Sequence, residues 1–409
     1  MPLKICKLIQ WHPFLDARIF KKEAKSLVRH GYEVTMIAPK RNGYLFDIDG
    51  TPFTDRFLEQ KFVHDGVTII TYDQTMPSWS EMQSALRVNG QLPSTNPLVS
   101  LGIAQDADVF HAHEFFSLYA GVCIKRALRA KGKEVKLVYD SHEVYPDPYS
   151  NMSERSIKRL HEMLLNMIPD IDVIITVSDS MKAWYLSINP EIEAEVIYNS
   201  PPLAPEPTPK AYPNNQLVVC YEGIMGFHKG NAATIIQITE ECNKHFDFTF
   251  KIIGGMINGH KLELPAQIKD KVRFTGWVPY NSIPTHMEEV DVGWIDYKYP
   301  HMLNHQLALP NKFFSLLNNS VPVVVNKCHE METLIRRHQC GLVIDKKLPS
   351  STDYTNAFRY LFEHQDVMRQ MSMNARKMMK EIYCWELMEK RLLSLYERLE
   401  NPGSVLFLR

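Results

Sequence analysis

The sequence predicts an α/β protein made of two doubly wound domains, each with a parallel sheet covered by helices on both faces. Short segments rich in Val and Ile alternate with helical stretches over residues 1–200, and this alternation restarts near residue 217. Between the two halves, six of the fifteen residues in 201–215 are prolines, a composition that disfavours both sheet and helix. The length of 409 residues also exceeds what one hydrophobic core usually supports.

Seven buried parallel strands are expected in the first half, because short apolar runs suit strands that are covered on both faces. They lie at residues 4–10, 33–38, 67–72, 108–112, 135–139, 172–177 and 195–198. Helices are expected at 17–30, 117–130 and 153–167, and Gly31 follows the first of them, where a left-handed cap suits glycine. Residues 73–96 form a polar connection of unusual length, which predicts either a lid or a disordered segment.

The second half repeats the pattern with six expected strands. They lie at residues 217–222, 248–254, 272–274, 290–295, 322–326 and 341–344. Residues 383–399 have a broad apolar face at helical spacing and predict a C-terminal helix. The expected domains are therefore 1–200 and 216–380, joined by the linker 201–215 and followed by a C-terminal helix and tail at 381–409.

Composition narrows the class of protein. The chain is 45% hydrophobic with a formal charge of −1, which is typical of globular proteins and argues against a nucleic-acid partner. Its seven cysteines are scattered and never form a Cys-x-x-Cys pair, so neither a disulfide framework nor a zinc site is expected. The absence of a signal peptide or a long apolar run predicts a cytoplasmic location.

Candidate catalytic residues follow three strands of the first half, at the sheet edge where open α/β folds bind ligands. His12, Asp16 and Arg18 follow the first strand. Asp16 has a second interpretation, as a helix cap with Arg18 on the helix surface.

Two His-Glu pairs follow the fourth and fifth strands: His113-Glu114 and His142-Glu143. An imidazole and a carboxylate can orient or deprotonate a hydroxyl nucleophile, so His142, Glu143, His113 and Asp16 are the catalytic candidates. A purely structural role for both pairs stays open. No metal site is expected, because the sequence fixes only adjacent pairs and a metal needs three or four convergent ligands.

The second half contains two candidate phosphate-binding elements. Gly223, Lys229 and Gly230 lie in a turn that opens a helix, where free N–H groups and a cation suit a diphosphate. Further on, residues 308–325 combine the turn Pro310-Asn311, the cation Lys312, a short apolar helix and a buried strand.

The order and spacing of these motifs resemble GT-B glycosyltransferases of the retaining family 4 type, also called glycosyl transferases group 1. The resemblance runs over about residues 4–399 and includes Asp140-Ser141-His142-Glu143, the Gly-Lys-Gly turn and Pro310-Asn311-Lys312-Phe313-Phe314. It implies two Rossmann-like domains facing across a cleft, with the last helix crossing back to the first domain.

The resemblance also implies a reaction. A sugar would pass with retention from a nucleoside diphosphate, UDP or GDP, to a sugar, lipid-linked or protein-linked hydroxyl, in surface polysaccharide or glycoconjugate synthesis. The nucleotide sugar is a co-substrate, and no tightly bound cofactor is expected. Lys229 and Lys312 would stabilise the departing diphosphate, and Val278 would lie beside the base, unless the neighbouring Trp277 is simply a buried residue at a strand end.

Ser315 departs from the family pattern, because most relatives have a Glu there that holds the ribose hydroxyls. Ser315→Glu is expected to tighten nucleotide binding if the ribose lies over this helix, and to weaken it if the site has repacked. Two other functions stay open: a sugar-nucleotide epimerase with the same donor site, and a non-catalytic binding protein, which Ser315 favours. A basic stripe on the first helix (Lys21, Lys22, Lys25 and Arg29) is either a solvated face or a contact with the inner face of the membrane.

Overall fold

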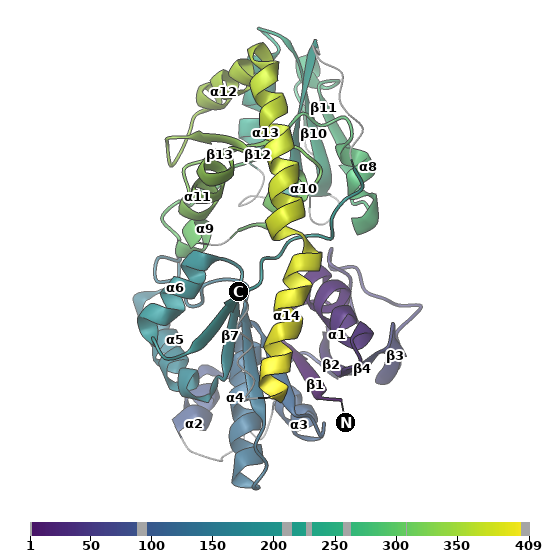
Figure 1. Cartoon of the computed structure of the whole chain (residues 1–409), viewed down its shortest axis with the longest axis vertical. Coiled ribbons are helices and arrows are strands. Elements are labelled where there is room, and N and C mark those ends of the chain that lie inside the picture. Colours follow the sequence, from purple (N-terminus) through teal and green to yellow (C-terminus); the bar gives the residue numbers. More distant parts are fainter. Residues whose placement is uncertain are drawn as a thin grey trace. The chain divides into compact units, whose positions relative to one another are not determined.

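The computed structural model describes residues 2–87, 96–206, 215–225, 231–256, 263–307 and 309–401. The chain divides into two compact units (Figure 1), one formed by Met1–Tyr198 with Met388–Arg409 and the other by Asn199–Leu387. Each unit is an α/β domain with one sheet.

The first unit has an eight-stranded sheet in the order β3-β4-β2-β1-β5-β6-β7-β8. All neighbouring strands are parallel except the pair β3 and β4. The strands are β1 (Lys4–Ile9), β2 (Glu33–Lys40), β3 (Lys61–His64), β4 (Val67–Asp73), β5 (Val109–His113), β6 (Lys136–Ser141), β7 (Val173–Thr176) and β8 (Glu193–Val196). The chain runs from β1 to one side of the sheet and later returns to pair β5 on its other side. The carboxyl ends of β1 and β5 are thus a topological switch point, where such sheets bind ligands.

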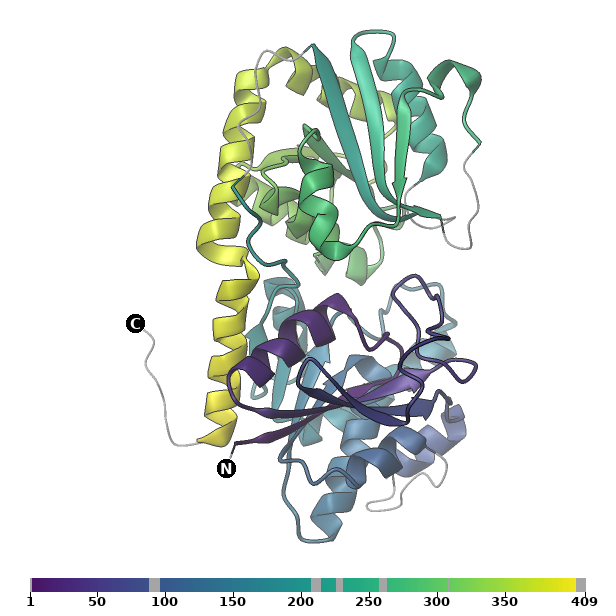
Figure 2. The same cartoon turned by 90° about the vertical axis from the view of Figure 1, so that its right-hand side faces the viewer.

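Helices cover both faces of this sheet. Figure 2 shows the first helix, in purple, on one face and the blue helices on the other. The helices are η1 (Ala17–Ala24), α1 (Lys25–Arg29), α2 (Trp79–Arg87), α3 (Pro97–Ile103), α4 (Glu114–Ala130), α5 (Glu154–Met167), η2 (Ile168–Asp170) and α6 (Asp179–Ile188). The last helix, α14 (Trp385–Glu400), joins this unit from Met388 onward, which confirms the expected return of the chain to its first domain. None of the described helices is both long and apolar enough to cross a membrane.

The second unit has a six-stranded, fully parallel sheet in the order β11-β10-β9-β12-β13-β14. The strands are β9 (Gln216–Met225), β10 (Asp247–Met256), β11 (Val272–Gly276), β12 (Val292–Ile295), β13 (Val323–Asn326) and β14 (Gly341–Ile344). The helices are α7 (Ala232–Cys242), η4 (Ala266–Ile268), η5 (Tyr280–Ser282), α8 (Ile283–Met287), α9 (Leu303–Leu307), α10 (Asn311–Asn318), α11 (His329–His338), α12 (Ser351–Glu363), α13 (Gln365–Met378) and η6 (Met379–Tyr383). The switch point of this sheet lies at the carboxyl end of β9, between β10 and β12.

Two expectations about local structure need correction. The connection at 73–96 is not simply a loop, because it contains α2, whose Met82, Ala85 and Leu86 are buried in the core of the first unit. Residues 88–95 lie outside the described part of the chain. The strand expected at 195–198 begins and ends earlier, as β8.

Candidate functional site

A cluster of buried charged and polar side chains lies beneath the switch point of the first sheet. The strand register pairs Lys7 on β1 with His111 on β5, and His113 with Asp140 on β6. Because His111 and His113 are two residues apart on one strand, their side chains share a face of the sheet. The Lys7 Nζ atom lies 2.7 Å from Glu23 Oε2 and 3.2 Å from both His111 Nδ1 and His113 Nε2. The ammonium group is therefore at the centre of the cluster.

The helix η1 supplies the opposite charges. It is a π-helix capped by Asp16, whose Oδ1 accepts hydrogen bonds from the backbone N–H groups of Arg18 and Ile19 at 2.8 and 3.0 Å. In a π-helix, residues five apart lie on the same face, so the Arg18 Nε atom reaches Glu23 Oε1 at 3.0 Å. Arg18 also donates two hydrogen bonds to Asp140, at 2.9 and 2.8 Å. Asp16 is thus a helix cap, but the idea that Arg18 lies on the surface is wrong, because Arg18 is 1% exposed.

The charges of the cluster fix the protonation of its members. Burial would raise the pKa of Asp140, but Arg18 and His142 hold the pKa of that carboxyl well below its usual range. Burial and the neighbouring Lys7 lower the pKa of His113 well below its usual value. His113 is therefore a neutral, buried imidazole that lies between Lys7 and His142 and does not reach solvent.

The solvent-facing part of the cluster is formed by His142 and Glu114. His142 Nε2 lies 3.2 Å from Asp140 Oδ2, and its Nδ1 lies 3.5 Å from Glu114 Oε1. The backbone N–H of His142 donates to the same Glu114 oxygen at 3.2 Å. Glu143, by contrast, is exposed. The interacting carboxylate and imidazole thus directly follow two neighbouring strands, β5 and β6, and His142 is not paired with the residue adjacent to it in sequence.

The pKa values of His142 and Glu114 are both raised. Burial would lower the pKa of His142, but the Asp140 and Glu114 carboxylates raise it to about 9. Burial raises the pKa of Glu114 to about 7, against the opposing effect of His142. At neutral pH the site therefore presents an imidazolium beside a half-ionised carboxyl, a combination that can donate and accept protons.

Two sets of side chains are close enough to be considered as metal ligands. In the first (Glu23, His111, His113 and Asp140), the Lys7 ammonium occupies the space that an ion would need. The second set is formed by His12, Glu114 and His142. A histidine must be neutral to bind a metal, so the raised pKa of His142 opposes metal binding at this set.

The basic stripe expected on the first helix does not form a continuous surface. Lys22 is 3% exposed, and burial with the nearby Arg18 lowers its pKa to about 7. Lys25 pairs with Asp65 at 2.7 Å, and Arg29 pairs with Glu389 at 2.6 Å. Lys22 is therefore not part of an exposed basic face, and contact of this helix with a membrane stays a prediction.

A second site lies at the carboxyl end of β9 in the second unit. Gly223 has a φ of +122°, and a Cβ atom there would lie 3.4 Å from the Lys312 Nζ atom. The same Nζ lies 3.9 Å from the centre of the Tyr221 ring. Lys312 is the second residue of α10, after the N-cap Pro310 and the first residue, Asn311. The turn, the cation and the glycine therefore gather at one edge of the sheet, as expected for phosphate binding.

Beside this cation lies a carboxyl group that the sequence analysis did not single out. Burial raises the pKa of Glu222 to about 7, while a hydrogen bond with Ser315 and the charge of Lys312 act in the opposite direction. Ser315 is buried on α10. Strand and helix thus bring one acid, one hydroxyl and one cation together.

Three further residues, Lys229, Gly230 and Val278, were expected at the donor site from the sequence. Lys229 and Gly230 lie outside the described residues. Val278 is half-buried in the loop after β11, and its neighbour Trp277 is 44% exposed, so the interpretation of Trp277 as a buried strand-end residue is wrong.

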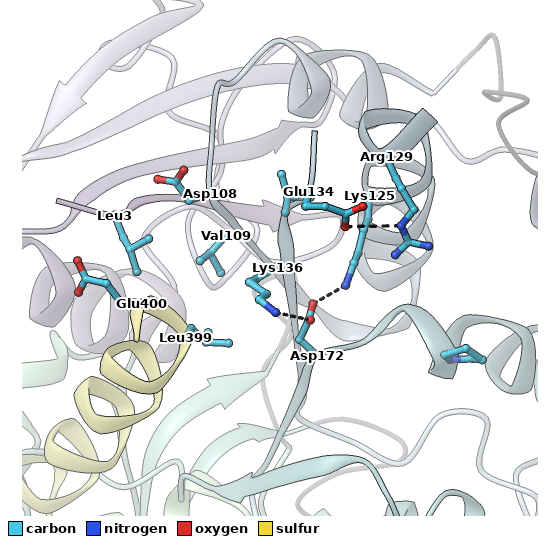
Figure 3. A pocket seen from close by; sticks show the side chains of 12 residues that line it. Leu3, Asp108, Val109, Lys125, Arg129, Glu134, Lys136, Asp172, Leu399 and Glu400 are labelled. Atoms are coloured by element: carbon cyan, nitrogen blue, oxygen red, sulfur yellow. Dashed lines mark hydrogen bonds and ion pairs between the residues drawn. The ribbon is translucent and has the colours of Figure 1, made fainter. Parts of the chain in front are cut away.

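A cavity of about 460 Å³ in the first unit (Figure 3) belongs to neither site. It lies at the amino ends of β5 and β6, the edge opposite the switch point, and is lined in part by Lys125, Lys136 and Asp172. Both lysines form ion pairs with Asp172. These three charged groups are thus partnered with one another, and the cavity lies at the edge of the sheet opposite the one where such folds bind ligands.

The two sheets and their switch-point sites define a GT-B fold, and family comparisons agree. Residues 17–201 match the model of Glycosyltransferase Family 4, and residues 218–364 match that of Glycosyl transferases group 1. The chain belongs to this family of GT-B glycosyltransferases.

Individual relatives are distant. YtcC of Bacillus subtilis (strain 168), named as a candidate glycosyltransferase, is 23% identical over 267 residues, which cover 59% of this chain and 64% of YtcC, less than two thirds of its length. Sucrose-phosphate synthase from Thermosynechococcus elongatus has a similar structure, with a TM-score of 0.69 at 13% identity, over 98% of this chain and 100% of that one. HepE from Anabaena, solved in complex with UDP, has a TM-score of 0.67 at 16% identity, over 97% and 100% of the two chains.

Proposed function

We propose that this protein is a glycosyltransferase that moves a sugar from a nucleoside-diphosphate donor to a hydroxyl acceptor with retention. The observation that carries the proposal is the gathering of Lys312, Gly223 and the start of α10 at the switch point of the second sheet. HepE, which shares the fold, has been solved with UDP and with UDP-glucose, so a UDP-sugar is the donor class we favour.

The second unit would hold the diphosphate. Lys312, together with Lys229 from the turn after β9, would stabilise the negative charge that develops on the leaving group. Gly223 lets the backbone approach the phosphates, since it has no side chain to fill the space before Lys312. The backbone N–H of Asn311, the first residue of α10, would add a donor, and Gly230 and Val278 would lie along the nucleotide.

The first unit would act on the acceptor. His142 is the group best placed to donate a hydrogen bond or a proton to a reacting oxygen, and Glu114 is its acidic partner. Asp140, held by Arg18, positions the His142 ring. Asp16 would hold His12 beside this pair, since His12 Nδ1 lies 3.6 Å from Asp16 Oδ2. The acceptor would be a sugar, lipid-linked or protein-linked hydroxyl used in polysaccharide or glycoconjugate synthesis.

A panel of nucleoside diphosphates tests the donor site directly. We expect UDP to raise the melting temperature of the protein, because a ligand at 100 times its dissociation constant adds about 2.7 kcal/mol to stability. Stabilisation by GDP and not by UDP would indicate that the donor is a GDP-sugar.

Incubation with the donor alone, followed by NMR, would reveal an isomerised sugar if the protein were an epimerase. Failure of every nucleotide to stabilise the protein would favour a non-catalytic role.

Lys312→Ala and Lys229→Ala are each expected to weaken binding of UDP by about 10- to 150-fold, because a hydrogen bond to a charged group contributes about 1.5–3 kcal/mol. Calorimetry measures the change. Lys271→Ala is a matched control in the same unit, since Lys271 precedes β11 and pairs with Asp247, the first residue of β10, at the opposite edge of the sheet. Affinities equal to that of the control would remove both lysines from the donor site.

A further inference from the structure

The carboxyl group of Glu222 is incompletely satisfied in the described structure. Its Oε2 atom is inaccessible to solvent and has no hydrogen-bond partner among the described residues. The side chain as a whole is only partly buried, so the carboxyl lies at the border between the protein and the space at the end of β9. A buried acceptor without a donor is unfavourable, and in native proteins it often marks a place where a ligand or water completes the bonding.

The position of this carboxyl relative to Lys312 suggests which ligand group it meets. Lys312 and Ser315 are three residues apart on α10, so they share a face and are separated by about 4.5 Å along the helix axis. Glu222 interacts with both of them. A nucleotide whose phosphate contacts Lys312 would then bring its ribose, the next group along the molecule, within reach of Glu222 and Ser315.

We propose that Glu222, on β9, supplies the carboxylate that holds the ribose hydroxyls of the donor, in place of an acid at position 315 of α10. This inference rests on the proposed function and deepens it. Doubly wound folds commonly hold ribose hydroxyls with an acidic side chain, because a carboxylate has acceptor oxygens for two neighbouring hydroxyls. Ser315 is small enough to leave room for Glu222 and orients it through its hydroxyl.

Glu222→Gln keeps the size of the side chain and removes its charge. We expect the affinity for UDP to fall about 10-fold, because a charge-assisted hydrogen bond becomes a neutral one. The affinity for 2′-deoxy-UDP should change much less, since that probe lacks one of the hydroxyls. The preference for UDP over 2′-deoxy-UDP is the readout that a merely structural role would not change. An unchanged preference in a folded variant would overturn the inference.

An exchange of the two side chains gives an independent test. Ser315→Glu alone would place a second carboxylate against Glu222, and we expect it to weaken UDP binding by about 10-fold or more. The double variant Glu222→Ser with Ser315→Glu keeps one carboxylate and one hydroxyl, so its affinity should return to within about 3-fold of the starting protein. Tighter binding by Ser315→Glu alone, or no recovery in a folded double variant, would overturn the inference. If the unaltered protein binds no nucleotide, the proposed function itself fails and the inference falls with it.

Discussion

Arg18→Met is expected to lower the stability of the first unit by about 3–5 kcal/mol, because it leaves the Asp140 carboxylate buried without its main partner. Both oxygens of Asp140 accept hydrogen bonds from Arg18, and neither side chain is more than 1% exposed. Hydrogen exchange at the amides of β5 and β6 would measure the change in this unit alone. Amides of β12 and β13, in the second unit, should keep their protection.

An exposed ion pair provides the matched control. Arg336 pairs with Glu332 at 2.8 Å, one turn apart on α11, and the Arg336 side chain is 62% exposed. Such surface pairs contribute at most about 1 kcal/mol, so Arg336→Met should change protection little. If Arg18→Met destabilised the protein no more than this control, the buried cluster would not be the electrostatic core that its distances imply. Arg18→Lys, which keeps the charge, allows the same comparison if the Met variant is insoluble.

The architecture was largely predictable from the sequence because parallel strands have a strong signature. Runs such as Val323–Asn326 and Val173–Thr176 are short, apolar and covered on both faces, and both were expected within a residue or two. The strand β3 was missed because it is a four-residue edge strand with alternating exposure and an antiparallel partner. The helix α2 was missed because its apolar residues are confined to one narrow stripe inside a polar segment.

The buried cluster was harder to predict, because its members come together only through the strand order. Lys7 and His111 are 104 positions apart in the sequence and become neighbours through the pairing of β1 with β5. One local signal was present: Lys7 lies between apolar residues in the interior of the strand KICKLI and needs a buried partner. The neighbouring strand β5 carries the corresponding signal, since His111 and His113 are two residues apart and place two polar side chains on the same face.

Glu222, the acid proposed for the donor site, shows a second limit of prediction from the sequence. Position 315 departs from the family pattern, but no motif in the sequence distinguishes Glu222, 93 positions earlier, as its possible substitute. With a carboxyl already beside Ser315, the structure favours the weaker-binding outcome for Ser315→Glu. That outcome depends on a contact between β9 and α10, which no local pattern reveals.

His142→Gln is expected to reduce turnover by about 10²- to 10⁴-fold and to leave the affinity for UDP nearly unchanged. The size of the loss is that of a group that transfers or holds a proton at the reacting oxygen. A fall in kcat without a change in donor affinity marks an interaction made with the acceptor or the transition state. Initial rates with a sugar acceptor, together with calorimetry of UDP, measure the two quantities separately.

The pH profile distinguishes a proton-carrying His142 from a structural one. Because the pKa of His142 is raised to about 9, turnover of the unaltered protein should fall as the pH rises through 9 and the imidazolium loses its proton. The same shift makes a stabilising contribution that is complete below about pH 6.5, the pKa in the unfolded chain, and is lost as the pH rises to 9. In His142→Gln the alkaline fall in turnover should be absent.

Two neighbouring carboxylates give the comparison that decides the role of this site. Glu114→Gln should reduce turnover and lower the pKa of His142, because it removes one of the two carboxylates that raise it. Glu143→Gln, at the exposed residue next to His142, should leave both the rate and the profile almost unchanged. If the Glu143 variant lost activity while the Glu114 variant did not, the adjacent pair would be the working one, and the interaction of His142 with Glu114 would be only structural.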